Sequence, residues 1–212
     1  MRVQRTLLRV ALFHVEHLER LRLLSSEFGF PLDGGQLESL EDYVHWLADE
    51  AAAAGGIGPN EVPQLLERHV GDALTWLQPI DAAPISLLDV GSGVGLPGIP
   101  LAIALPNTQI TLLDRSGRRC GLLRRAIRVL DLQHVVVRQD DVTGVDDQAD
   151  VVVSRASLPP DQLLPHLRRI ARVLAIVGGS TAAPVEVPGY TTVKIESRYL
   201  DSPRWMLIMR PS

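Results

Sequence analysis

The 212-residue sequence predicts an α/β fold, in which five parallel strands and a C-terminal antiparallel hairpin form one mixed sheet behind a helical N-terminal extension. Three observations support this prediction. An apolar run of strand length, residues 85–90, leads into a glycine-rich turn. From there to residue 177, strand-like and helix-like segments alternate, as in parallel sheets with right-handed crossovers. Two last strand-like segments, 191–198 and 204–210, are joined by Asp201-Ser202-Pro203, which predicts a hairpin.

The composition is that of an ordinary globular protein, with 46% hydrophobic and 22% charged residues. The net charge of −4 does not by itself indicate a nucleic-acid-binding protein. We expect no membrane segment, because no apolar run approaches roughly 18 residues, and no signal peptide. The single cysteine, Cys120, fits a reducing compartment. We therefore expect a cytoplasmic protein and favour a monomer. We expect no metal, since His14 and His17 have helical spacing but no third ligand.

Residues 1–80 predict the helical extension, and residues 81–212 the α/β domain. Apolar residues recur at helical spacing from Leu7 to Leu24, and glycines and prolines then break the pattern. A second helix is expected over residues 36–54, and a third from Asn60, a good N-cap, to about Gln78. In the domain we expect strand 85–90, helix 97–105, strand 109–114, helix 116–130, strand 134–139, strand 150–154, helix 161–172 and strand 173–177.

The turn after the first strand is the strongest functional signal. Its glycines permit positive φ and let a ligand approach the backbone. Dinucleotide sites also space glycines after a first strand, but they seat a pyrophosphate on a helix N-terminus, which the Asp89 carboxylate would repel. The turn resembles the first motif of class I S-adenosylmethionine (SAM) methyltransferases, whose ligand is a sulfonium without phosphate. The alternative for Asp89 is a helix cap. The resemblance implies SAM as cofactor and these contacts: Asp89, Gly91, Ser92, Gly93, Gly95, Leu96 and Pro97.

Acidic residues follow the next two strands. Asp114 ends the second strand, where a carboxylate can accept from both ribose hydroxyls of a ligand on the turn. Arg115 follows it as a further cofactor contact, and the alternative for Asp114 is a helix cap. After the third strand, Asp140 or Asp141 can accept from an adenine amino group, while Val142 meets the ring; a solvated acidic loop is the alternative.

Basic residues mark the expected acceptor side. Arg155 follows the fourth strand, where its planar fork could hold a phosphate or a guanine edge; an ion pair is the alternative. The predicted helix 116–130 carries a series of arginines that suits an RNA backbone, unless it is only a solvated helix face. The arginines in and just before this helix are Arg115, Arg118, Arg119, Arg124, Arg125 and Arg128.

Residues 87–126 resemble the RsmG (GidB) family, bacterial methyltransferases that act on guanine N7 in small-subunit ribosomal RNA. The most specific matches are residues 95–102, Gly-Leu-Pro-Gly-Ile-Pro-Leu-Ala, and the segment that contains Asp114, Arg118 and Arg119. Arg68-His69 and Ser154-Arg155-Ala156 match further family segments. Two family features are missing: a W-N-x-x-x-N-L-T-like stretch after the second helix, and a lysine-glycine pair after the fifth strand.

The resemblance implies methyl transfer from SAM to guanine N7 in 16S ribosomal RNA, with that RNA or the 30S particle as partner. It implies Ser154 and Arg155 as catalytic residues, with Arg155 also contacting the cofactor. It implies RNA contacts at Arg68, His69, Arg118, Arg119 and Arg125. N7 offers a lone pair and no proton, so orientation rather than a general base supplies the rate. Two alternatives stay open: a SAM-dependent methyltransferase of a small molecule or another RNA, and a non-catalytic SAM-binding protein.

Overall fold

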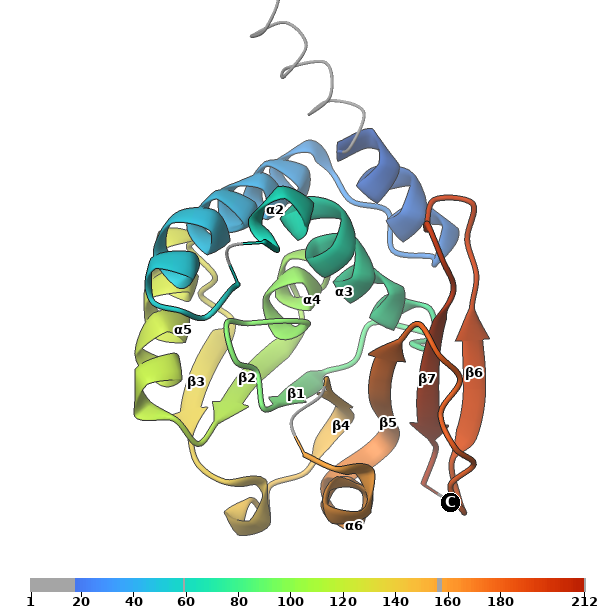
Figure 1. Ribbon diagram of the computed structural model, residues 1–212. Helices are drawn as coiled ribbons and strands as arrows, with labels where there is room; N and C mark the ends of the chain where they lie inside the picture. The colour runs from blue at the N-terminus through green and yellow to red at the C-terminus, as the bar shows by residue number, and fades with distance from the viewer. Residues whose placement is uncertain (1–17, 59, 156–157, 212) are drawn as a thin grey trace, which may run out of the picture.

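The computed structural model describes residues 18–58, 60–155 and 158–211. In this part of the chain, seven strands form one sheet in the order β3-β2-β1-β4-β5-β7-β6 (Figure 1). The first five strands run parallel, and β7 is antiparallel to both β5 and β6. The predicted mixed sheet is therefore confirmed. The strands are β1 (Ser86–Val90), β2 (Gln109–Asp114), β3 (Val135–Gln139), β4 (Ala149–Ser154), β5 (Ala171–Ser180), β6 (Thr191–Ile195) and β7 (Arg204–Met209).

Helices cover both faces of the sheet. One face carries α4 (Gly98–Ala104) and α5 (Gly117–Val129), and the other carries α6 (Pro160–Ile170). Successive side chains of a strand point to opposite faces. In β1, Leu87 accordingly belongs to the cluster under α4 and α5, while Leu88 and Val90 belong to the cluster under α6. This alternation also turns Asp89, between Leu88 and Val90, toward α4.

The helical extension packs over the α4 side of the sheet (Figure 1). Residues 18–27 are helical, and α2 (Gly34–Trp46) continues into a π-helical stretch, Leu47–Ala51. A capping box between Asp33 and Gln36 fixes the start of α2, two residues before the predicted start. The part of the first predicted helix that includes Leu7, and also His14 and His17, lies outside the described residues.

The third predicted helix, residues 60–78, is instead a chain of short helical turns. These turns are Val62–Gln64, Leu65–Gly71, α3 (Asp72–Leu74) and Thr75–Leu77. Gln64 leaves helical geometry, with φ of −118° and ψ of 8°, which separates the first two turns. The apolar spacing correctly predicts the buried residues Leu65, Val70, Leu74 and Leu77 but not the breaks between the turns.

The extension and the sheet share one hydrophobic cluster that includes Tyr43 and Trp76 as well as Ile99 and Leu101. A buried ion pair also links the extension to the sheet, because Arg204 at the start of β7 binds the Asp72 carboxylate at 2.5–2.8 Å. The domain division at residue 80 stays a prediction. Among the described residues, none of the helices is long and apolar enough to cross a bilayer. The same residues include no group of three His, Cys, Asp or Glu side chains placed to hold a metal ion.

Candidate active site

The glycine turn lies at the carboxyl end of β1 and is tied to β2. The N–H groups of Gly91 and Ser92 donate to the Leu113 carbonyl at 2.8 and 3.0 Å. Gly91, Gly93 and Gly95 have φ of 75°, 63° and 105°, as their predicted role requires. A Cβ at Gly93 would meet nothing closer than the Gly91 carbonyl oxygen at 3.9 Å. Gly93 therefore presents bare backbone to open space, where a ligand can approach it closely.

Asp89 lies beneath the turn and holds the start of α4. Its carboxylate is buried, and Oδ2 accepts from the Gly98 N–H at 3.1 Å. A Cβ at residue 98 would come within 2.5 Å of that oxygen, so glycine is required there. Burial raises the pKa of Asp89 to about 7, although hydrogen bonds from Ser92 and Gly98 and the charge of Arg155 oppose the shift. The structure thus gives Asp89 the capping position that sequence reasoning left as its alternative.

Asp114 connects the turn to β2. Its buried carboxylate accepts from the Gly93 N–H through Oδ2 at 3.0 Å and from the Ser116 N–H through Oδ1 at 2.9 Å. The Arg119 guanidinium lies 3.6 Å from Oδ2. A carboxylate has about four acceptor sites, so these contacts leave capacity for further donors from a ligand. Asp114 therefore both shapes the turn and faces the pocket beside it.

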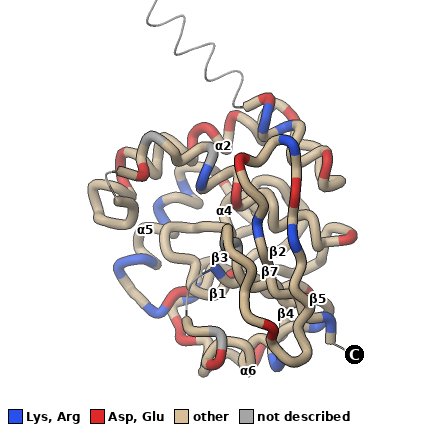
Figure 2. The backbone as a smooth tube through the Cα atoms, turned by 45° about the vertical axis from the view of Figure 1, so that its right-hand side comes forward, with Lys and Arg blue, Asp and Glu red and all other residues tan. Residues whose placement is uncertain are grey.

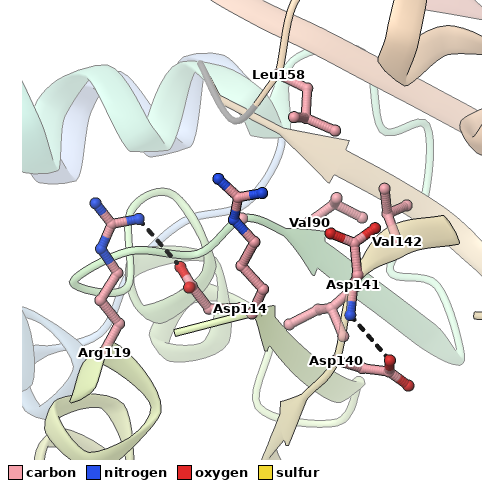
Figure 3. Close-up of a pocket in the computed structure, with 10 residues that line it drawn as sticks. Val90, Asp114, Arg119, Asp140, Asp141, Val142 and Leu158 are labelled. Atoms are coloured by element: carbon pink, nitrogen blue, oxygen red, sulfur yellow. Dashed lines mark hydrogen bonds and ion pairs between the residues drawn. The ribbon is translucent and has the colours of Figure 1, made fainter. Parts of the chain in front are cut away.

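A first pocket, with about 550 Å³ of space partly open to solvent, lies at the ends of β1, β2 and β3. Figure 3 shows the Asp141 carboxylate beside Val90 and Val142, whereas the Asp140 side chain turns away from them. A hydrogen bond from Arg138 lowers the pKa of Asp140, and the Thr143 N–H lowers the pKa of Asp141. The pocket is lined by Val90, Gly91, Leu113, Asp114, Arg115, Arg119, Asp140, Asp141, Val142 and Leu158.

A second, larger pocket, with about 1450 Å³ of space that includes open solvent, adjoins the first, and Gly91, Arg115 and Arg119 line both. It lies between the glycine turn and the helical extension. The structure brings Ser92, Gly93, Leu96, His69, Arg118 and Arg155 to its walls. Three predicted cofactor contacts, Asp89, Gly95 and Pro97, are not among the lining residues.

Ser154 is the last residue of β4, and Arg155 follows it. The buried Ser154 hydroxyl donates to the Val90 carbonyl at 2.8 Å, which ties β4 to β1. Arg155 is half-buried and lines the second pocket. His69 lies nearby, with Nε2 at 3.2 Å from Glu61. Burial lowers the pKa of His69, and the charge of Arg155 adds to that shift while Glu61 opposes it.

The remaining predicted RNA contacts lie away from the two pockets. Arg68 is exposed in a groove that shares Glu61 and His69 with the second pocket. Arg125 on α5 pairs with Glu50 at 2.5 Å and lines neither pocket. Figure 2 shows that acidic and basic residues are interspersed over the molecule, with basic positions along α5. The roles of these side chains in binding stay predictions.

Sequence reasoning missed two residues that shape the site. The buried Tyr43 hydroxyl, on α2, donates to the Val94 carbonyl of the glycine turn at 3.0 Å. Glu61, which the sequence marks only as a residue of a helix start, borders the second pocket. No spacing signal links Tyr43 or Glu61 to the turn, because the tertiary packing of the extension makes both contacts.

The sheet order, with β7 antiparallel between β5 and β6, is that of the class I methyltransferase fold. Magnesium protoporphyrin IX methyltransferase from Synechocystis, solved with bound SAM, shares this fold at a TM-score of 0.50 and 19% identity, over 68% of this chain and 78% of that one. The family model described as rRNA small subunit methyltransferase G matches residues 36–183, and the chain belongs to this GidB family.

Two curated relatives carry the name ribosomal RNA small subunit methyltransferase G. The one from Rhodococcus jostii is 38% identical over 176 residues, which are 79% of this chain and 77% of the relative. The one from Streptomyces avermitilis is 39% identical over 143 residues, 64% of this chain. The match spans only 60% of the Streptomyces relative. The expected family is therefore confirmed.

Proposed function

We propose that this protein transfers the methyl group of SAM to N7 of a guanine in 16S ribosomal RNA. Membership of the family and the names of the relatives support the reaction and the RNA as substrate. Free small-subunit RNA or the 30S particle would then be the partner, and the cytoplasm the place of action. The site residues named below are our assignments.

The observation that carries the proposal is the position of the carboxylates around the glycine turn. The Asp89 carboxylate accepts a hydrogen bond from the Gly98 N–H at the start of α4. A dinucleotide pyrophosphate would sit on a helix start of this kind. Asp114, Asp140 and Asp141 line the first pocket, beside Arg115 and Arg119. A ligand with hydroxyl and amino donors fits these carboxylates, whereas a pyrophosphate would compete with Asp89 for the Gly98 N–H.

The residues present fit SAM in one orientation. Asp114 would accept from the ribose hydroxyls, and Asp141 from the adenine amino group, with the ring between Val90 and Val142. The open backbone at Gly93 leaves room for the amino-acid end of the cofactor in the second pocket. That placement directs the reacting end toward Arg155 and the basic wall formed by Arg118 and Arg119.

When bound, SAM supplies an electrophilic methyl group: the N7 lone pair forms the new N–C bond as the C–S bond breaks, and the positive charge passes from sulfur to the guanine ring. The protein needs to remove no proton from N7, so its part is to hold the acceptor in line. Arg155 can donate to O6 beside N7, which fixes the plane and the tilt of the base. Ser154, bound to the Val90 carbonyl, positions Arg155 rather than reacting.

Two measurements test the proposal. Calorimetry should show binding of SAM and S-adenosylhomocysteine but not of NAD. Incubation with tritiated SAM should label unmethylated small-subunit RNA at N7 of guanine. If SAM-bound protein labels a pool of metabolites or another RNA instead, the substrate assignment is wrong. Binding without transfer to any substrate would identify a non-catalytic SAM-binding protein.

A further inference from the structure

The second pocket has one acidic wall residue in an otherwise basic and neutral surface. Four arginines, including Arg155, line the pocket. Glu61 is the one carboxylate among the described residues that line it. Its side chain is 54% exposed, and it also borders the groove that carries Arg68. A carboxylate at this place has no part in the proposed grip on the adenosine, so its presence calls for a separate role.

Glu61, His69 and Arg155 all line the second pocket. Glu61 Oε2 lies 3.2 Å from His69 Nε2, and the charges of both Glu61 and Arg155 act on the imidazole. The wall therefore presents a donor at Arg155 and an acceptor at Glu61. One contact to His69 leaves Glu61 with several unused lone pairs.

A guanine base has an acceptor edge and a donor edge, which match the donor at Arg155 and the acceptor at Glu61. Its N7 and O6 are acceptors on one edge, while N1–H and the 2-amino group are donors on another. If N7 faces the methyl group, O6 lies on the same side and suits Arg155. The donor edge then faces away from the reaction and needs an acceptor. Adenine would place its own acceptor, N1, against that carboxylate, which would be repulsive.

We propose that Glu61 is the specificity residue for the target base, and that it accepts hydrogen bonds from the N1–H and 2-amino group of guanine. This proposal rests on the proposed function. It also makes Glu61 part of the rate enhancement, because the methyl transfer moves a positive charge onto the guanine ring. A carboxylate beside that ring binds it more tightly in the transition state than in the ground state.

Inosine tests this contact, because it differs from guanosine only by lacking the 2-amino group. Small-subunit RNA is assembled by ligation with guanosine or inosine at the methylated position, and kcat/KM is measured for each. The wild type should prefer guanosine by about 10- to 100-fold, as expected for one hydrogen bond to a charged acceptor. Glu61→Ala should slow both RNAs, mainly through kcat, and slow guanosine more because it loses two hydrogen bonds and inosine loses one, so that the preference falls to about one.

His69→Ala is the matched control, because it breaks the same ion pair but leaves the carboxylate in place. It should slow both RNAs yet keep the preference for guanosine. The affinity for SAM, measured by calorimetry, should stay within about threefold in Glu61→Ala. Glu61→Gln, which keeps the side-chain shape and one acceptor oxygen, should retain part of the preference.

The proposal is overturned if Glu61→Ala keeps the guanosine preference, or if His69→Ala loses it as well. It is also overturned if Glu61→Ala weakens SAM binding, since Glu61 would then hold the cofactor ammonium group. If the wild type labels no guanosine in small-subunit RNA, the proposed function fails instead, which is a different result.

Discussion

Replacing Asp114 by asparagine tests the coupling between the glycine turn and cofactor binding. The carboxylate accepts from the N–H groups of Gly93 and Ser116 at 3.0 and 2.9 Å. Asp114→Asn keeps the shape but exchanges one acceptor oxygen for an NH₂ group, so one of the two backbone donors faces another donor. Hydrogen bonds to charged groups contribute about 1.5–3 kcal/mol each, and we expect a loss of folding stability of that order.

The same substitution should weaken SAM binding. A ribose hydroxyl would lose its charged acceptor, for a cost of about 1.5–3 kcal/mol, which corresponds to roughly a 10- to 150-fold higher Kd. Calorimetry gives the Kd, and urea unfolding gives the stability. Both losses come from one side chain, so a control must separate them.

Asp150→Asn is that control, because Asp150 also accepts from two backbone N–H groups, those of Ile85 and Ser86 at 3.0 and 3.1 Å. These contacts lie at the opposite end of β1 from the glycine turn. Both N–H groups donate to Oδ2, which the amide oxygen of Asp150→Asn can replace, so we expect a smaller loss of stability and an unchanged Kd for SAM. An unchanged Kd in Asp114→Asn, or an equal rise in both variants, would refute the reasoning.

Three further variants test other parts of the site. Tyr43→Phe leaves the buried Val94 carbonyl without its donor. We expect the free energy of unfolding, measured by thermal unfolding, to fall by about 1–2 kcal/mol and the affinity for SAM to weaken several-fold. No change in either quantity would contradict the positioning role of Tyr43. Burial raises the pKa of Asp89 from 3.8 to about 7, so the folded protein keeps a proton that the unfolded chain releases, and stability falls as pH rises through that window. Asp89→Asn should reduce this fall in the free energy of unfolding by about 2 kcal/mol between pH 5 and 7. An unaltered pH profile of unfolding would contradict the raised pKa of Asp89. The double variant Arg118→Ala with Arg125→Ala should spare SAM binding but lower the salt slope of RNA affinity by about 1.4.

The charge-matched control for that double variant is Arg172→Ala with Arg210→Ala. Arg172 and Arg210 also form ion pairs, with Asp150 and Asp81, and they lie at the other end of the sheet. Its RNA affinity and salt slope should match the wild type. If both double variants weaken RNA binding equally, the effect is one of net charge, and α5 is not the contact surface.

Much of the sheet could be predicted from local patterns. Apolar runs bounded by glycine and proline mark the strands, and the extended β5 alone clearly exceeds its predicted range. The short turns of residues 62–77 could not be predicted, because Leu65, Val70 and Leu74 occupy buried positions in either arrangement. Periodicity reports which residues are buried and says little about where the backbone hydrogen-bond pattern changes.

The candidate site also has features that local sequence predicts and features that it does not. Asp114 ends its strand at a position where sheet geometry brings it to the first turn, so sequence order was enough to place it at the pocket. The direction of Asp89 depends on which face of the sheet α4 covers, and local sequence does not carry that information. Glu61 and Arg155 are 94 positions apart in the chain, and only the packing of the extension brings them to one wall.

A crystal structure with S-adenosylhomocysteine tests the central assignment most directly. We predict the ribose on Asp114, the adenine between Val90 and Val142, and the homocysteine sulfur over Gly93 on the side of Arg155. Density for the nucleoside anywhere else, or a pyrophosphate compound held by the glycine turn, would contradict the account.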